Sequence, residues 1–311
     1  MRESDRAAEA ERLRQEKLQE ARRLQMEGNP YGSELEGFAR ILDFDPKQGG
    51  IYYNKLNFVD LATFGHDEES PIGPMRFTDR VFEDNKATVC DAVNILSVKI
   101  ACSDIGFPIH VYGTVVARDC TDYKRIDLFR RDSDHCQLVN SKKESLILTG
   151  PNRGLALSCD DYVETDLKGV LTIWGVVHRP VKECKVETVS LATRLSTVNV
   201  MYAVVKSAVE ATIAVEVLQG EFYGVITAHT AGIRRSLVLY DTSKVAGDNC
   251  HGVIQLMRST VSVYVRDTLI IFSKTAGGIS AGLKCTPRCN GGDEIVFPLG
   301  DVLMRVRVAC Q

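Results

Sequence analysis

The strongest constraint on the fold of this chain is an internal repeat. Residues 112–129 return, without a gap, as residues 223–240. Both copies begin with Tyr-Gly, Leu128 returns as Leu239, and most other apolar positions exchange one apolar side chain for another. A pattern that recurs at a fixed offset indicates one structural unit used twice. We therefore expect the main body to consist of two related halves.

The repeated unit has the sequence pattern of antiparallel β-sheet. Apolar and polar residues alternate with period two in 212–217, 261–265 and 304–308. Such alternation is typical of strands with one buried face and one solvated face. Clusters of Asp, Asn, Gly and Pro separate the short strands, as at 150–152 and 290–293. Short strands at this spacing predict a sandwich or a barrel.

The fold class predicted is all-β: an antiparallel β-sandwich-like body over 91–311, with repeat halves at about 93–178 and 198–311. Two such halves can share one sandwich or stand as adjacent lobes. The connecting segment 179–197 is too short and too apolar for a free linker, which favours one compact body. Residues 198–210 fit a short helix or a hairpin, and their β-branched side chains favour the hairpin.

An N-terminal charged α-helix is predicted over residues 1–29. Residues 2–27 contain fourteen charged side chains, seven of each sign, and no Gly or Pro. They are strong helix formers; Ser4 fits an N-cap and Gly28 fits a helix stop. Arg12 and Glu16 can pair one turn apart. Because the leucines do not keep a coiled-coil seam, we expect a lone solvated helix, with a coiled-coil arm as the alternative.

Residues 30–90 predict an irregular, extended segment. Short apolar pieces at 38–44 and 56–64 are separated by Gly49-Gly50 and by a Pro- and Gly-containing stretch at 71–74. These residues interrupt regular structure. We expect the segment to lie on the β-body or to be loosely tethered to it.

Composition excludes several classes of protein. The chain has 311 residues, 44% apolar and 25% charged, and a net charge of −3. These values predict a soluble globular protein without bulk attraction to nucleic acid or anionic membrane. The charged N-terminus predicts no secretory signal, and no apolar run is long enough to span a membrane. Ten dispersed cysteines then indicate reduced thiols and a cytoplasmic location, with a nuclear location as the alternative.

Several motifs resemble one known family. The stretches 112–119, 127–132 and 148–155 are similar to an uncharacterised family of plant proteins, a domain of unknown function expanded in grasses. Residues 74–79 and 209–213 resemble it too, so the similarity covers roughly 75–311. In some relatives this domain is appended to a ribosome-inactivating domain, as in jasmonate-induced proteins of cereals. The resemblance therefore implies a link to plant stress or defence.

The resemblance does not bring the toxin's activity with it. The ribosome-inactivating N-glycosidase uses a Glu-Ala-x-Arg helix, whereas here Glu210-Ala211 is followed by Thr212 and Ile213. That stretch has the pattern of a strand, as does the stretch around Trp174, the single tryptophan. The chain is thus expected to be the appended domain without the toxin.

Two cysteine motifs are candidates for chemistry. Cys285 and Cys289 are closely spaced, but a zinc site needs a second pair, and the nearest histidine is His251. Asp134-His135-Cys136 places an acid, a base and a nucleophile side by side. Neighbours on a strand point to opposite faces, and a catalytic Cys–His pair usually meets from different segments. We interpret the first motif as thiols flanking a turn and the second as a polar loop tip.

Aspartates gather at the predicted strand ends. They are Asp119, Asp122, Asp132, Asp134, Asp160 and Asp161. Calcium-binding sandwiches collect carboxylates from such loops, although Asp is common in turns because it bonds its own backbone. Thr230 and Ile233 replace Asp119 and Asp122 in the second repeat, which favours the turn role.

A basic edge is the last candidate. Arg125, Arg130 and Arg131 have counterparts in Arg234 and Arg235, and together they could meet phosphate or RNA. No aromatic residues for base stacking accompany them, so we expect no nucleic-acid partner. The glycine-rich stretch 150–154 lacks the Gly-Lys-Ser/Thr ending of a phosphate loop and predicts a β-turn.

These observations favour a non-catalytic β-domain that acts as a protein-interaction or regulatory module. An exposed strand face or loop edge would recognise an unknown protein partner. No catalytic, cofactor-binding or metal residue is assigned, and no cofactor or membrane is expected. The alternative is an rRNA N-glycosylase or translation inhibitor related to ribosome inactivation. A third hypothesis is a calcium- or glycan-binding sandwich.

Overall fold

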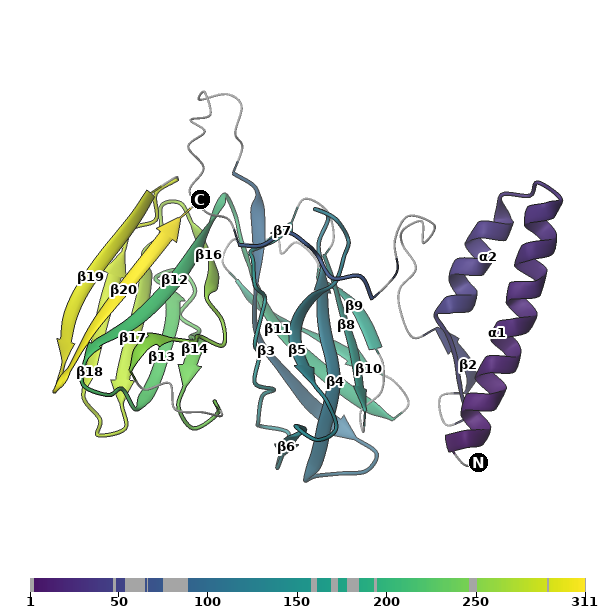
Figure 1. Cartoon of the computed structure of the whole chain (residues 1–311), viewed down its shortest axis with the longest axis horizontal. Helices are drawn as coiled ribbons and strands as arrows, with labels where there is room; N and C mark the ends of the chain where they lie inside the picture. Colours follow the sequence, from purple (N-terminus) through teal and green to yellow (C-terminus); the bar gives the residue numbers. More distant parts are fainter. Residues whose placement is uncertain are drawn as a thin grey trace.

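Two β-sandwiches stand side by side in the computed structural model, and a helical hairpin lies beside the first of them (Figure 1). The structure describes residues 3–46, 49–53, 65, 67–74, 89–157, 161–168, 173–177, 185–192, 195–245, 251–289 and 291–310. We call residues 91–205 the first lobe and residues 208–310 the second lobe.

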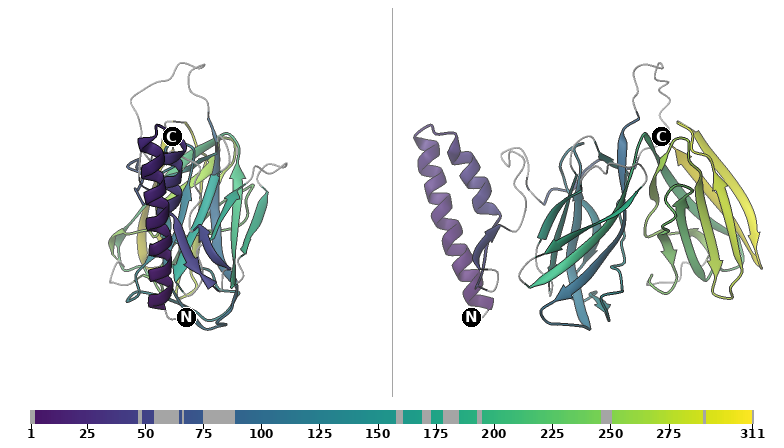
Figure 2. Two further views of the ribbon diagram at one scale, coloured as in Figure 1. Left: turned by 90° about the vertical axis from the view of Figure 1, so that its right-hand side faces the viewer. Right: turned by 180° about the vertical axis from the view of Figure 1, so that it is seen from behind.

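The N-terminal hairpin consists of α1 (Glu3–Met26) and α2 (Tyr31–Arg40). Small residues line the contact between the helices: Ala10 and Ala21 of α1 are buried. A Cβ atom at Gly32 would lie 2.8 Å from the carbonyl oxygen of Ala21, so only glycine permits this close approach. Figure 2 shows the two helices running alongside each other, at one end of the molecule.

The charged helix predicted at the N-terminus is confirmed. Nη1 of Arg12 donates to Oε1 of Glu16 at 2.6 Å, and Gly28 follows the helix with a φ of +71°. Ser4 lies within the first turn, so it is not the residue that caps the helix. The expectation of a lone solvated helix is wrong, because α2 packs along α1. Arg14 donates to the carbonyl oxygen of Leu42 at 2.9 Å, just beyond the end of α2.

The irregular segment predicted for residues 30–90 is wrong over its first part. Besides α2, it contains a short antiparallel pair, β1 (Leu42–Asp45) and β2 (Gly50–Tyr53). The sequence does not predict α2, because two glycines lower its intrinsic helix propensity. Packing against α1 stabilises this helix instead. Residues 67–74 do lie on the first lobe: Ser70 N–H donates to the Arg125 carbonyl at 2.9 Å. Residues 54–64, 66 and 75–88 lie outside the described residues.

The first lobe is a sandwich of two antiparallel sheets. The strands of one sheet, in spatial order, are β10 (Val186–Ala192), β11 (Ser196–Val205), β3 (Asp91–Ser103) and β7 (Leu155–Leu157). Those of the other are β5 (Ile126–Arg131), β4 (Ile109–Arg118), β8 (Asp161–Lys168) and β9 (Ile173–Val177), with β6 (Gln137–Val139) also paired to β4.

The second lobe repeats this arrangement. One sheet has the order β19 (Gly291–Leu299), β20 (Val302–Cys310), β12 (Ala208–Gln219) and β16 (Thr260–Tyr264), with β15 (Gly252–Ile254) also paired to β12. The other has the order β14 (Leu237–Asp241), β13 (Gly224–Thr230), β17 (Leu269–Thr275) and β18 (Ser280–Cys285).

The sequence repeat is therefore a repeat of structure. Strand for strand, β10-β11-β3-β7 corresponds to β19-β20-β12-β16, and β5-β4-β8-β9 corresponds to β14-β13-β17-β18. Even an irregularity recurs. Leu128 is the extra residue of a bulge between β4 and β5, and its repeat partner Leu239 is the extra residue between β13 and β14. Bulges of this kind are structural features rather than defects.

Each lobe closes its own apolar core, so of the two arrangements left open by the sequence the halves form adjacent lobes. The first core includes Val98, Leu128 and Val200, and the second includes Ile213, Leu239 and Val306. The first lobe also continues through Val205, because residues 186–192 of the expected connection form β10. Residues 179–184 and 193–194 of that connection lie outside the described residues.

The all-β body after an N-terminal helix is confirmed, and so is the strand pattern that predicted it. Met304, Val306 and Val308 are buried, while Arg305 and Arg307 between them stay at the surface. Residues 198–210 form the hairpin of β11 and β12. Among the described residues, no helix has the length and apolar character that a membrane span requires.

Candidate binding cleft between the two lobes

The two lobes contact each other in a reciprocal way. Nδ2 of Asn94 on β3 donates to the Ser262 carbonyl of β16 at 2.7 Å, and Ser262 N–H donates back at 3.0 Å. In the other direction, Gly154 N–H, next to β7, donates to Oε2 of Glu210 on β12 at 2.6 Å. Because β3 corresponds to β12 and β7 to β16, equivalent strands make the contact from both sides. A small apolar cluster around Ala203, Val205 and Ile233 adds to it.

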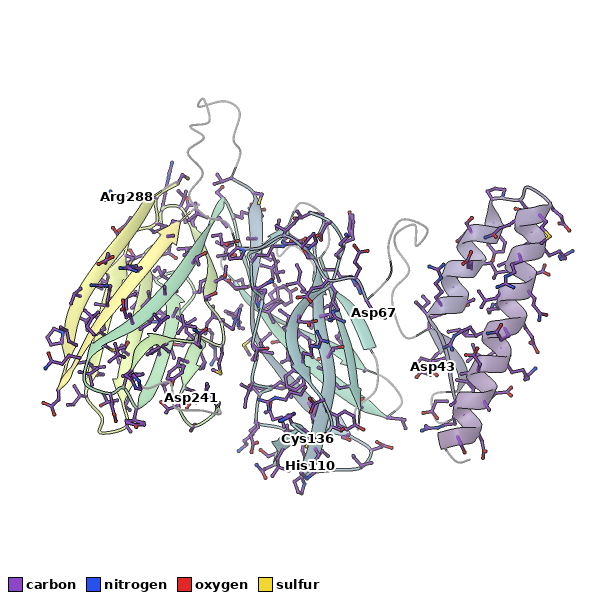
Figure 3. The ribbon with its side chains drawn as sticks, in the orientation of Figure 1. Asp43, Asp67, His110, Cys136, Asp241 and Arg288 are labelled. Carbon is purple, nitrogen blue, oxygen red and sulfur yellow. The ribbon has the colours of Figure 1, made fainter. Side chains whose placement is uncertain are left out.

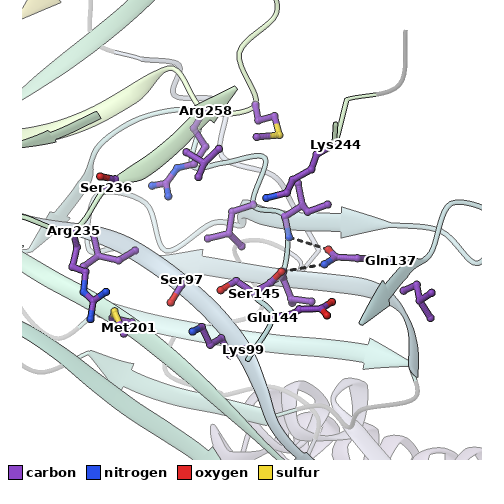
Figure 4. Close-up of a pocket in the computed structure, with 17 residues that line it drawn as sticks. Ser97, Lys99, Gln137, Glu144, Ser145, Met201, Arg235, Ser236, Lys244 and Arg258 are labelled. Carbon is purple, nitrogen blue, oxygen red and sulfur yellow. Dashed lines mark hydrogen bonds between the residues drawn. The ribbon is translucent and has the colours of Figure 1, made fainter. Parts of the chain in front are cut away.

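A cleft of about 670 Å³ opens along this contact. Its volume falls in the range of small-molecule sites, which are about 300–1,000 Å³. The lining residues come from both lobes: Leu96, Ser97, Lys99, Gln137, Leu138, Glu144, Ser145, Leu146, Ile147, Leu148, Met201, Arg235, Ser236, Val238, Lys244, Met257 and Arg258. Apolar side chains and cations dominate this lining (Figure 4).

Arg258 is the distinctive group of the cleft. It precedes β16 and is only 3% exposed. Nη1 donates to the Ile95 carbonyl of the first lobe at 2.7 Å, and Nε has no hydrogen-bond partner among the described residues. No ion pair joins Arg258 to any carboxylate of the described residues. Burial lowers the pKa of Arg258 to about 10, so the guanidinium remains charged at neutral pH.

Two β-bulges hold Arg258 in this place. The backbone N–H of Met257 donates to the carbonyl of the bulged Leu239 at 2.8 Å, which ties the preceding loop to the sheet. Across the cleft, Leu96 is the extra residue of a bulge between β3 and β11. It follows Ile95, whose carbonyl accepts from Arg258. Bulges often occur beside functional sites, where they redirect side chains.

Three further cations surround the cleft from different elements (Figure 4). Lys99 lies on β3, Arg235 precedes β14, and Lys244 follows β14. Of these three cations, only Lys244 makes an ion pair with a described residue, Asp241, at 3.2 Å. The single carboxylate of the lining, Glu144, accepts hydrogen bonds from the backbone N–H and Nδ2 of Asn140. The described lining thus has a positive balance.

The first lobe pairs Arg153, one of the two buried arginines among its described residues, with a carboxylate. Arg153, which precedes β7 and is 4% exposed, donates from Nη1 and Nη2 to the two carboxylate oxygens of Asp119, at 2.5 and 2.9 Å. Burial alone would lower the pKa of Arg153, but the hydrogen bonds and charge of Asp119 outweigh burial and raise it. In the second repeat, Thr230 stands in the place of Asp119.

The aspartates singled out from the sequence are mostly turn and ion-pair residues. Besides Arg153, Asp119 accepts from the backbone of Thr121, and Asp122 accepts from that of Lys124. Asp132 accepts from His135. Asp160 and the side chain of Asp161 lie outside the described residues. Within the described residues, no three His, Cys, Asp or Glu side chains come together as metal ligands.

The Asp134-His135-Cys136 motif forms an exposed loop tip, as expected. The sulfur of Cys136 nevertheless contacts a histidine from another segment: its Sγ lies 3.3 Å from Nδ1 of His110 (Figure 3). Sequence spacing could not show this pair, because β4 and β6 bring the residues together. At the other cysteine motif, Cys285 is buried and Cys289 is exposed.

The basic residues do not form one shared edge. Arg125 and Arg130 both pair with Asp127, at 3.0 and 3.5 Å. Arg130 and Arg131 line a separate cavity of about 470 Å³ on the first lobe, whereas Arg235 lines the cleft between the lobes. The stretch 150–154 leads into strand β7 rather than a helix, as expected for a loop that is not a phosphate loop.

The stretch compared with the toxin's catalytic helix is a strand, as predicted. Glu210 lies on β12, and its carboxylate binds the Gly154 backbone of the other lobe. The side chain of Trp174 lies outside the described residues.

Comparisons with known proteins complete the description. A family model described as a domain of unknown function (DUF6598) matches residues 92–308. No curated protein matches. Among solved structures, human GIVD cytosolic phospholipase A2 in complex with methyl gamma-linolenyl fluorophosphonate shares 10% identity, with a TM-score of 0.21. The similarity covers 72% of this chain and 33% of that one, and a TM-score this low supports no argument about fold or function.

Proposed function

Because the chain belongs to the DUF6598 family, a domain of unknown function, we propose from its geometry that it is a non-catalytic binding domain. Its ligand occupies the cleft between the two lobes. The observation that carries this proposal is the cleft itself: a cavity of about 670 Å³ whose lining combines apolar side chains with cations from both lobes.

The chemistry of the lining supports binding rather than catalysis. The polar groups described there are four cations, three serines, one glutamine and one glutamate. The glutamine is engaged with backbone: Nε2 of Gln137 donates to the Ser145 carbonyl, and Oε1 accepts from Ile147 N–H. Cations and apolar groups bind and orient a ligand, while covalent chemistry needs a nucleophile with an adjacent base.

The sequence resemblance adds a biological setting to this proposal. The stretches 112–119 and 148–155 resemble a plant family with members linked to ribosome-inactivating domains. We therefore place the binding role in plant stress or defence, with the cleft acting as the regulatory or recognition element of a cytoplasmic protein.

The proposal is tested by filling the cleft. Ser236 is exposed on the cleft wall, so Ser236→Trp should occupy the cavity without disturbing a core. Ser280→Trp is the matched control, because Ser280 is exposed on β18 of the same lobe and does not line the cleft. Ligand-observed NMR with a set of small organic acids, phosphate esters and neutral apolar compounds would report binding to each protein.

We expect several compounds to bind wild type and Ser280→Trp, and to lose binding to Ser236→Trp. Equal binding to all three proteins, or binding to none, would overturn the cleft as the functional site. A parallel incubation of the purified chain with ribosomes tests the non-catalytic part. Intact rRNA is expected, and clean depurination would overturn that part.

A further inference from the structure

We propose that the cleft is a site for an organic oxyanion, a carboxylate or phosphate head group carrying an apolar body, with Arg258 as its anchor. This inference rests on the proposed function, because it names the class of ligand that the cleft between the lobes would hold.

The buried guanidinium of Arg258 is the first support. A charge taken out of water is costly unless a partner compensates it. Arg258 is 3% exposed, and its one hydrogen bond goes to the neutral carbonyl of Ile95. Nε is buried without an acceptor, although Arg258 lines the cleft. An oxyanion in the cleft would supply the missing negative charge, since a guanidinium binds carboxylate and phosphate oxygens strongly.

The first lobe shows what this fold does when a buried arginine is structural. Arg153 receives both oxygens of Asp119, and Ala156 N–H donates to the same carboxylate at 3.0 Å. The second repeat has Thr230 at the position of Asp119, so the internal carboxylate is missing there. Thr230 instead accepts from Ile233 N–H at 3.0 Å. The charge on Arg258 is thus left for a partner from outside the described chain.

The neighbouring cations of the cleft also favour an anionic ligand. Lys99 and Arg235 line the same cavity and make no ion pair with the described residues, whereas Lys244 is paired with Asp241. Burial pushes the pKa of Asp241 upward, but hydrogen bonds from Ser243 and Lys244 outweigh it and lower that pKa. Asp241 therefore stays ionised and compensates Lys244 alone. Converging cations in a partly enclosed site raise the local concentration of anions.

The rest of the lining determines what the anion is attached to. Eight of the lining residues are aliphatic or methionine: Leu96, Leu138, Leu146, Ile147, Leu148, Met201, Val238 and Met257. Bound inorganic phosphate would leave these apolar side chains exposed to water. A ligand with an apolar body would cover it, gaining about 25 cal/mol for each Å² removed from water. The geometry therefore favours an amphipathic anion over a bare ion.

Three probes with one apolar body separate head group from body: hexyl phosphate, hexanoate and hexanol, with inorganic phosphate as the bare ion. Isothermal titration would compare wild type, Arg258→Met, Ser236→Trp and Ser280→Trp. Met keeps the unbranched length of the arginine stem and removes the charge. We expect at least one of the two amphipathic anions to bind wild type about tenfold or more tightly than hexanol and inorganic phosphate.

Arg258→Met should weaken that anion by about tenfold or more and leave hexanol unchanged. Whichever head group binds more tightly identifies the ligand class. If Arg258→Met fails to fold, the double variant Lys99→Gln with Arg235→Gln tests the contribution of the positive charge of the cleft. It should weaken the binding of the anions by about tenfold.

Two results would overturn the oxyanion assignment. One is hexanol binding as tightly as the anions, with Ser236→Trp abolishing both; the cleft would then remain a binding site for a neutral ligand. The other is anion binding unchanged in the charge-removing variants. If Ser236→Trp changes the binding of no probe, the cleft is not the binding site and the proposed function is wrong. That result differs from the two above, which overturn only the ligand class.

Discussion

Two buried arginines occupy comparable places in the two lobes and have opposite surroundings. Arg153 precedes β7 and is bound by the carboxylate of Asp119, while Arg258 precedes β16 and, among the described residues, its guanidinium binds only the Ile95 carbonyl. The strand orders around them are the same. The fold of a lobe therefore does not require an uncompensated arginine before this strand. The first lobe uses its arginine for stability, and the second lobe keeps a charge that costs stability and is suited to binding.

The largest effect is expected from breaking the compensated pair. Asp119→Ala removes the bidentate partner of buried Arg153 and leaves it only a longer ion pair, with Asp122 at 3.6 Å. It should lower the free energy of unfolding by about 3 kcal/mol. Urea titration followed by circular dichroism would measure the change. Asp119→Asn, which keeps an acceptor but removes the charge, should cost less than the alanine variant. A loss below about 1 kcal/mol would mean that Arg153 and Asp119 are not a stabilising pair.

The reciprocal contact between lobes comes next. Asn94→Ala leaves the buried N–H and C=O of Ser262 without their partner, so we expect a loss of about 2–3 kcal/mol. Weakened contact should also separate the unfolding of the lobes into two transitions. The matched control is Asn199→Ala, because Asn199 accepts an exposed hydrogen bond from Ser190. A single unshifted transition in the Asn94 variant would show that the lobes are joined by other contacts.

Replacing the uncompensated arginine should act in the opposite direction. Arg258→Met removes a buried charge at the cost of one hydrogen bond to a carbonyl, and we expect a gain of about 1 kcal/mol in unfolding free energy. The same urea titration measures it. A loss of more than about 1 kcal/mol would indicate that Arg258 serves the fold, as Arg153 does.

The smallest effect is expected where a paired arginine is exposed. Arg12 of α1 bonds Glu9 and Glu16, but all three side chains are accessible to solvent. Arg12→Ala should therefore change the unfolding free energy by about 0.3–1 kcal/mol. Thermal unfolding at low and high salt would confirm the surface character of these pairs. A cost as large as that of Asp119→Ala would contradict the role assigned to burial.

The sequence carries the repeated strand framework plainly but not the cleft. Alternation in 304–308 and the Leu128–Leu239 correspondence can be read along the chain, because a strand's two faces differ with period two. Helix α2 was missed because its glycines make it a poor helix by propensity, and its stability comes from packing against α1. The choice between one shared sandwich and two adjacent lobes cannot be predicted, because strand spacing does not show which strands close a core.

The candidate site cannot be predicted from the sequence for a related reason. Only strand pairing shows that Arg258 and Arg153 precede equivalent strands, β16 and β7. The neighbours of Arg258, namely Lys99, Arg235 and Lys244, are far apart along the chain. The one available signal was the replacement of Asp119 by Thr230. The Cys136–His110 pair was invisible for the same reason, since strand pairing alone brings it together.

The most direct test of Arg258 as the anion-binding group measures the unfolding free energy of wild type and Arg258→Met in parallel. Each protein is measured without ligand and with whichever of hexyl phosphate and hexanoate binds more tightly. A ligand that binds only the folded protein stabilises it in proportion to the logarithm of its concentration over its Kd. We predict that the variant is the more stable protein without the anion, and that wild type becomes the more stable one at saturating anion. Equal stabilisation of both proteins by the anion would contradict the assignment of Arg258 as the group that binds it.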